Sequence, residues 1–90
     1  MRVQVEASLY PLRTSDLSGP IEAFCEHLRQ RGLKIKTGAM STCISGDCGT
    51  VFAALEGAFG ESARGHEVVM TLKMSNACPE QGKGYTEAGR

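Results

Sequence analysis

Apolar and polar residues alternate along the first strand-like segment of the chain. In RVQVEASLY (residues 2–10), the odd positions are apolar and the even positions are mostly polar. The apolar row consists of Val3, Val5, Ala7 and Leu9. A period of two is typical of a strand with one buried face. Proline lacks the N–H of a ladder hydrogen bond, so we expect this strand to end at Pro11.

The period becomes helical from about residue 18 to residue 31. The apolar residues Ile21, Phe24, Cys25 and Leu28 are spaced as one stripe of a helix. Pro20 is acceptable in the first helical turn, and Gly32 supplies a stop after the last one. This pattern predicts the first helix.

Two alternating segments follow, residues 33–37 and 40–46, with Gly38 between them. In the second, Thr42 and Ile44 oppose Ser41, Cys43 and Ser45. We interpret them as two strands joined by a tight or bulged turn near Gly38, with one bent strand as the open alternative.

A second helix and a last strand complete the pattern. We expect Asp47 to cap a helix whose apolar positions are Val51, Phe52, Leu55 and Phe59, and which frays over 60–65. Segment 67–75 alternates again, with Val68, Met70, Leu72 and Met74 on one face. The order β-α-β-β-α-β predicts an α+β, ferredoxin-like fold, a four-stranded antiparallel sheet with two helices on one face. We assign residues 1–78 to this single domain and 79–90 to a flexible tail.

Composition narrows the class of protein. The 90 residues include ten basic and ten acidic side chains and are 41% hydrophobic, as expected for one small globular domain. The balanced charge argues against a nucleic-acid partner. No apolar run is long enough to span a membrane, and the N-terminal segment lacks the apolar core of a signal peptide. We therefore expect a cytoplasmic protein.

Four cysteines, Cys25, Cys43, Cys48 and Cys78, raise the question of metal or redox chemistry. No CxxC pair is present, and the spacings match no common disulfide scaffold. We interpret them as reduced structural thiols and predict no metal. A metal or redox carrier remains an alternative. It would need Cys43 and Cys48 to converge, with Cys78 as an optional third ligand.

Residues suited to catalysis are sparse. His27 lies on the first helix off its apolar stripe, and His66 lies in a loop. Spacing brings neither histidine near a nucleophile, and Ser8, Ser41 and Ser45 lack a nucleophile-elbow context. The sequence predicts no enzyme and no cofactor.

The sheet face opposite the helices carries a mixture of polar, aromatic and apolar side chains: Gln4, Glu6, Ser8, Tyr10, Cys43, Val69 and Thr71. Such a face can be exposed to solvent, or it can bind a ligand or a partner protein. Because Tyr10, Val69 and Cys43 are too apolar to stand fully in water, we expect a homodimer or a dimer of dimers. Ser8, Tyr10, Met40 and Thr42 suit a small-molecule pocket. Composition alone favours the simpler interpretation, in which Ser8 and Thr42 satisfy strand-edge hydrogen bonds and Tyr10 covers the rim of the core.

A family resemblance favours the pocket. SLYPL at 8–12, GLKIKTGAMSTCISG at 32–46, the following VFAAL and the closing MTLKMSNACP resemble the YkoF-like family of thiamine- and hydroxymethylpyrimidine-binding proteins. The resemblance covers residues 3–79. It implies ferredoxin-like domains, fused in tandem or assembled as oligomers, that bind thiamine or its pyrimidine moiety without catalysis. This chain holds one such copy, so a second copy would come from another subunit.

The resemblance places Ser8, Tyr10, Met40 and Thr42 in shared motifs. We hypothesise that the Ser8 and Thr42 hydroxyls bind the aminopyrimidine edge and that Met40 and Tyr10 flank its ring. Glu6 or Asp47 would balance the thiazolium charge. A regulatory oligomerisation module that binds no small ligand remains a further alternative.

Overall fold

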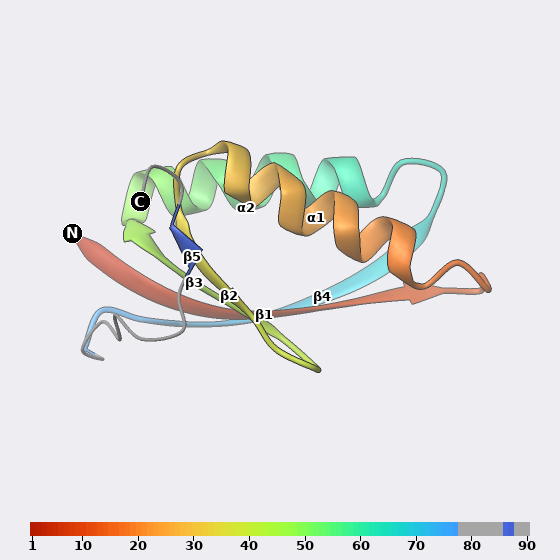
Figure 1. Ribbon diagram of the computed structural model, residues 1–90, viewed down its shortest axis with the longest axis horizontal. Coiled ribbons are helices and arrows are strands. Elements are labelled where there is room, and N and C mark those ends of the chain that lie inside the picture. Colours follow the sequence, from red (N-terminus) through yellow and green to blue (C-terminus); the bar gives the residue numbers. More distant parts are fainter. Residues whose placement is uncertain (78–85, 88–90) are drawn as a thin grey trace.

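The computed structural model describes residues 1–77 and 86–87. Two helices lie on one face of an antiparallel sheet and leave the other face, called here the open face, uncovered by helices (Figure 1). This arrangement confirms the predicted ferredoxin-like fold. In chain order the elements are β1 (Arg2–Leu12), α1 (Ser18–Gln30), β2 (Lys34–Thr37), β3 (Thr42–Asp47), α2 (Cys48–Ser62), β4 (Glu67–Ser75) and β5 (Thr86–Glu87).

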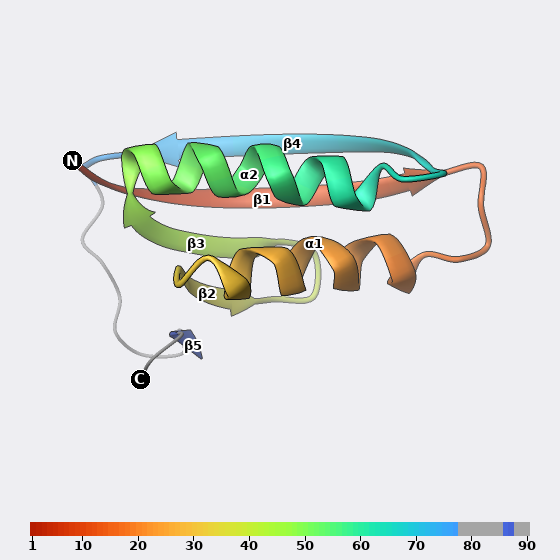
Figure 2. The same ribbon diagram turned by 90° about the horizontal axis from the view of Figure 1, so that it is seen from above.

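The strands are ordered β4-β1-β3-β2-β5, with β1 in the interior of the sheet (Figure 2). β1 pairs with β3 only as far as Ala7, which lies opposite Thr42, whereas its pairing with β4 continues to Leu12. The prediction that β1 ends at Pro11 is therefore wrong. Beyond Ala7 the strand has a single neighbour, and a proline is tolerated where one side of the ladder is empty.

The two-strand interpretation of residues 33–46 is confirmed. β2 and β3 form an antiparallel hairpin in which Ile35 lies opposite Ile44. The turn between them is closed by the Gly38 N–H, which donates to the Ser41 carbonyl oxygen at 2.8 Å. β3 begins at Thr42 rather than at Met40, because residues 38–41 are used by the turn.

The first helix buries three of the four residues of the predicted stripe, whereas Ile21 is 36% exposed. Phe24, Cys25 and Leu28 are buried against the sheet, and Gly32 follows the helix with a φ of 75°, a conformation that favours glycine. Before the helix, the Asp16 side chain accepts a hydrogen bond from the Gly19 N–H at 3.0 Å. This contact satisfies one of the free amides of the first turn.

The second helix buries two of its four predicted apolar positions, Val51 and Leu55, but not the two phenylalanines. Val51, Ala54, Leu55 and Ala58 are buried, whereas Phe52 is 56% exposed and Phe59 is 37% exposed. The small alanines let the helix approach the core closely, and they leave the two phenylalanines on its flank. Asp47 precedes the helix but makes no capping hydrogen bond with its side chain.

The two helices also pack against one another at a glycine. A Cβ atom at Gly57 of α2 would overlap the imidazole of His27 on α1. The Nε2 atom of His27 is buried there and has no hydrogen-bond partner among the described residues. Gly57 therefore makes the space that the imidazole occupies.

β4 has the predicted bounds and the predicted apolar row. The short strand β5 was not predicted; Thr86 lies opposite Ile35, and Glu87 opposite Lys34, on β2. The expected flexible tail over 79–90 otherwise falls outside the described residues. Within the described ranges, no helix is both long enough and apolar enough to cross a membrane.

Candidate functional site

A pocket of about 280 Å³ lies where β1 extends past the end of β3. β1 and the first residues of β3 form one side of it, the start of α1 forms another, and the β2–β3 turn forms the rim. The lining residues are Ala7, Leu9, Tyr10, Ile21, Phe24, Thr37, Gly38, Ala39, Met40, Ser41 and Thr42. The pocket lies there because β3 begins only at Thr42, which leaves β1 beyond Ala7 without a neighbour on that side.

The lining is apolar with a few hydroxyl groups. Thr37 and Thr42, which pair in register on the side of the buried Ala7, supply hydroxyls, and none of the described residues that line the pocket carries a formal charge. The Ser41 hydroxyl is bonded to Glu6 instead. Thr42 is 6% exposed, and its Oγ1 atom lies 3.6 Å from the buried Sγ atom of Cys25. Such a surface suits a neutral, largely apolar group with a small number of hydrogen-bonding atoms.

Tyr10 and Met40 stand at the mouth of the pocket. Tyr10 is 46% exposed at the end of β1, and Met40 is 81% exposed in the turn. A large apolar side chain with this exposure at a pocket rim can pack against a bound ring. The structure thus brings three predicted site residues, Tyr10, Met40 and Thr42, to one pocket.

Ser8 and Glu6 lie beside the pocket without lining it. The Ser8 hydroxyl donates to the Met40 carbonyl oxygen at 3.1 Å. The Glu6 carboxylate accepts a hydrogen bond from the Ser41 hydroxyl at 3.2 Å. Both side chains therefore contact the turn that forms the rim.

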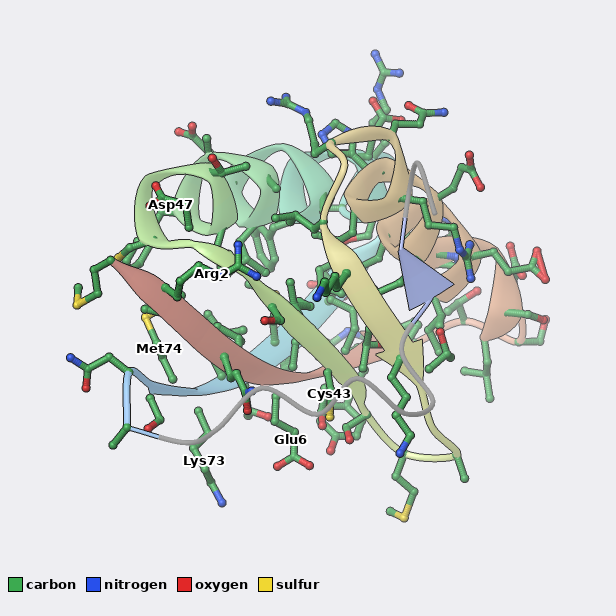
Figure 3. All side chains as sticks on the ribbon, turned by 60° about the vertical axis from the view of Figure 1, so that its left-hand side comes forward. Arg2, Glu6, Cys43, Asp47, Lys73 and Met74 are labelled. Atoms are coloured by element: carbon green, nitrogen blue, oxygen red, sulfur yellow. The ribbon has the colours of Figure 1, made fainter. Side chains whose placement is uncertain are left out.

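Asp47 lies at the opposite end of β3. Its register partner is Arg2, five pairs along the strand from the pair of Ala7 with Thr42, or roughly 17 Å at the ordinary strand rise. Asp47 Oδ1 lies 3.2 Å from the α-amino group of Met1, and this hydrogen bond is the main cause of its lowered pKa. Figure 3 shows Asp47 beside the start of α2, away from Glu6. The structure does not bring Asp47 to the pocket.

The two α1 residues of the lining, Ile21 and Phe24, and the turn residues other than Met40 were not among the predicted site residues. Ile21 and Phe24 belong to the apolar stripe of α1, which is the ordinary signal of a core position. The Gly38 turn between two alternating segments was a usable signal, because loops beside a rigid sheet often carry function.

The cysteines lie apart from one another. Cys25 is buried under α1, Cys43 lies on the open face, and Cys48 begins α2. Within residues 1–77, no three His, Cys, Asp or Glu side chains form a group that could hold a metal ion. Cys78 falls outside the described residues.

Comparison with known proteins assigns the chain to a family. A model of the YKOF-related family matches residues 2–81, nearly the whole of the described domain. The chain belongs to this family. No curated protein matches the sequence of this YKOF-related chain.

Solved structures share its fold. A hypothetical protein from Methanocaldococcus jannaschii is 26% identical, with a TM-score of 0.78 over 89% of this chain and 84% of that chain. A DUF77 domain of unknown function from Bacillus cereus is 22% identical, with a TM-score of 0.74 over 83% and 75%. A candidate thiamine biosynthesis/salvage protein from Thermotoga maritima is 18% identical, with a TM-score of 0.73 over 82% of each chain.

Proposed function

We propose that this YKOF-related chain binds thiamine or its hydroxymethylpyrimidine moiety without transforming it, in salvage or transport of the vitamin. The observation that carries the proposal is the uncharged pocket at the β1–β3 junction, which gathers Tyr10, Met40 and Thr42. The family membership and the thiamine-related description of the Thermotoga maritima protein support the choice of ligand.

The pyrimidine is the part of the vitamin that suits this pocket. An aminopyrimidine is flat and uncharged when unprotonated, and its edge alternates donors and acceptors. Tyr10 and Met40 would cover the ring at the mouth of the pocket, and the Thr37 and Thr42 hydroxyls would bind its edge, since a hydroxyl can both donate and accept. In this arrangement Phe24 closes the inner wall, where it is almost fully buried.

The uncharged lining favours unphosphorylated forms of the vitamin over its phosphate esters. A phosphate group placed among uncharged side chains would lose its hydration without gaining a cationic partner. We therefore propose an unphosphorylated ligand. The thiazolium ring of thiamine, which carries a positive charge, would extend out of the mouth toward water.

Calorimetric titration with hydroxymethylpyrimidine, thiamine and thiamine diphosphate tests the proposal. We expect the first two to bind and the diphosphate to bind at least about tenfold more weakly. A ligand at a hundred times its Kd stabilises the fold by about 2.7 kcal/mol, which raises the Tm of a small domain by on the order of 10 °C. Removal of one hydroxyl by Thr42→Val is expected to weaken binding about fivefold, since a lost hydrogen bond costs about 1 kcal/mol.

Thr50→Val is the matched control, because Thr50 is an exposed threonine on α2 that does not line the pocket. If neither thiamine nor hydroxymethylpyrimidine binds, the vitamin proposal fails and an oligomerisation module becomes the better interpretation. If thiamine diphosphate binds more tightly than thiamine, the argument from the uncharged lining is wrong.

We also propose that the chain associates with a second copy of itself through β4. Among the described strands β4 pairs only with β1, so its other edge is open. Leu72, in the apolar row of β4, is 44% exposed. Phe52 and Phe59 lie on the same side of α2, and this side is nearly opposite the side on which Gly57 faces α1. An apolar surface beside an unpaired strand edge is typical of a strand-pairing interface.

Sedimentation of two lysine variants distinguishes this edge from the open face. Leu72→Lys is expected to convert a dimer into a monomer at micromolar concentration, because it places a charge in the apolar interface. Val69→Lys is the matched control, since Val69 is equally exposed on the same strand but lies on the open face opposite Tyr10. Dissociation by Val69→Lys alone would favour an open-face dimer, and a monomeric wild-type protein would contradict both.

A further inference from the structure

The rim of the pocket, residues 38–41, lies beyond the end of the backbone ladder. The last register pair between β1 and β3 joins Ala7 to Thr42, so the rim has no strand pairing with β1. Its own turn is closed by the hydrogen bond from the Gly38 N–H to the Ser41 carbonyl oxygen. Beyond Thr42, direct contacts between the rim and β1 therefore come from side chains and not from the backbone ladder.

Two side chains of β1 make that connection. Ser8 donates to the Met40 carbonyl oxygen, and Glu6 accepts from the Ser41 hydroxyl. Glu6 and Ser8 alternate with the buried residues of β1, so both belong to the open face of the sheet. The pocket lies on the helix side, between the sheet and α1. The rim is thus attached to β1 from the side that a ligand does not touch.

We infer that Glu6 and Ser8 are positioning residues, which fix the rim of the pocket and act on affinity without contacting the ligand. The inference rests on the proposed function, because it assigns these residues a role in that binding site. A rim held in place before binding loses less conformational freedom when the ligand arrives, and affinity rises accordingly.

This role differs from that of a charge partner for the thiazolium ring. The register neighbours of Glu6 are Cys43 on β3 and Lys73 on β4 (Figure 3). All three side chains stand on the open face, across the sheet from the pocket. Glu6 therefore contributes a hydrogen-bond acceptor to Ser41, and an uncharged acceptor of the same shape can replace it. A molecule that bound the open face and took Glu6 as its partner would loosen the rim.

The experiment compares Glu6→Gln, Glu6→Ala and Ser41→Ala by calorimetric titration with thiamine and with hydroxymethylpyrimidine. Glu6→Gln keeps an acceptor oxygen and is expected to bind both ligands within twofold of wild type. Glu6→Ala and Ser41→Ala are each expected to weaken both ligands about fivefold. The double variant is expected to be no weaker than either single variant, because both changes remove the same hydrogen bond. Glu56→Ala, which removes an exposed carboxylate from α2, is the control.

Selective loss of thiamine by Glu6→Gln would overturn the inference and identify Glu6 as a charge partner. An unchanged affinity in both Glu6→Ala and Ser41→Ala would also overturn it. Hydrogen exchange of the Gly38 amide gives a second measurement that needs no ligand. It is expected to accelerate in Glu6→Ala and Ser41→Ala but not in Glu6→Gln. If the wild-type protein binds neither ligand, the proposed function fails. If exchange of the Gly38 amide is unchanged in Glu6→Ala and Ser41→Ala, the inference that the Glu6–Ser41 hydrogen bond fixes the rim fails, whatever the ligand result.

Discussion

The substitution Ala7→Leu is expected to weaken binding of the proposed ligand about thirtyfold while leaving the fold intact. Ala7 is buried, lines the pocket and lies opposite Thr42, so a leucine there would project three additional carbon atoms into the space that the ring requires. A steric penalty of about 2 kcal/mol lowers affinity about thirtyfold. Calorimetric titration measures this loss, and thermal unfolding is expected to show an unchanged or slightly higher Tm, because the new side chain fills a pocket.

Ala54→Leu is the matched control for that experiment. Ala54 is fully buried in α2 and does not line the pocket, so the same enlargement there should overpack the core and cost about 1–3 kcal/mol of stability. Its folded fraction should bind ligand as wild type does. Wild-type affinity in Ala7→Leu would show that the ligand binds elsewhere.

The second large effect is expected at Gly57. Alanine is the better helix former by about 1 kcal/mol, yet Gly57→Ala should lower the free energy of unfolding by about 1–3 kcal/mol. The reason is the overlap between the new Cβ atom and the His27 imidazole. Urea denaturation measures the change. In a His27→Ala background the overlap disappears, so the same substitution should stabilise the protein by up to about 1 kcal/mol.

Gly60→Ala separates the steric effect from helix propensity. Gly60 belongs to the same helix, and a Cβ atom there would meet nothing within 4 Å. We expect Gly60→Ala to stabilise the protein slightly. If Gly57→Ala were equally stabilising in the wild-type background, the close packing of His27 against α2 would be wrong.

The element order and the antiparallel pairing could be predicted from residue patterns because local periodicity determines them. The alternation over 2–9 and 67–75 appears in the structure as expected, and so does the stripe of α1 except at Ile21, which is exposed. The prediction that β1 ends at Pro11 was wrong because a proline disrupts a strand only where its missing N–H would have faced a neighbouring strand. Whether β1 has a neighbour there depends on the relative lengths of β1 and β3, which local sequence does not determine.

Phe52 and Phe59 show a different limit. Helical spacing groups them with Val51 and Leu55, but the packing of α1 beside α2 determines which part of that wide stripe is buried. Ala54 and Ala58 occupy the buried positions because their small side chains allow α2 to pack closer to the core.

The candidate site was predictable in part for a similar reason. Tyr10, Met40 and Thr42 could be grouped from strand adjacency, whereas the contribution of Ile21 requires knowing how α1 crosses the sheet.

Among the described residues, those that line the pocket all fall within the stretch 7–42, and α2 and β4 contribute none. Under the two proposals, mutations in the second half of the gene can change the β4 interface without altering the pocket. Ligand choice and quaternary structure would then be free to diverge separately among relatives, and a graft of residues 7–42 onto a homologous second half is expected to carry the specificity with it.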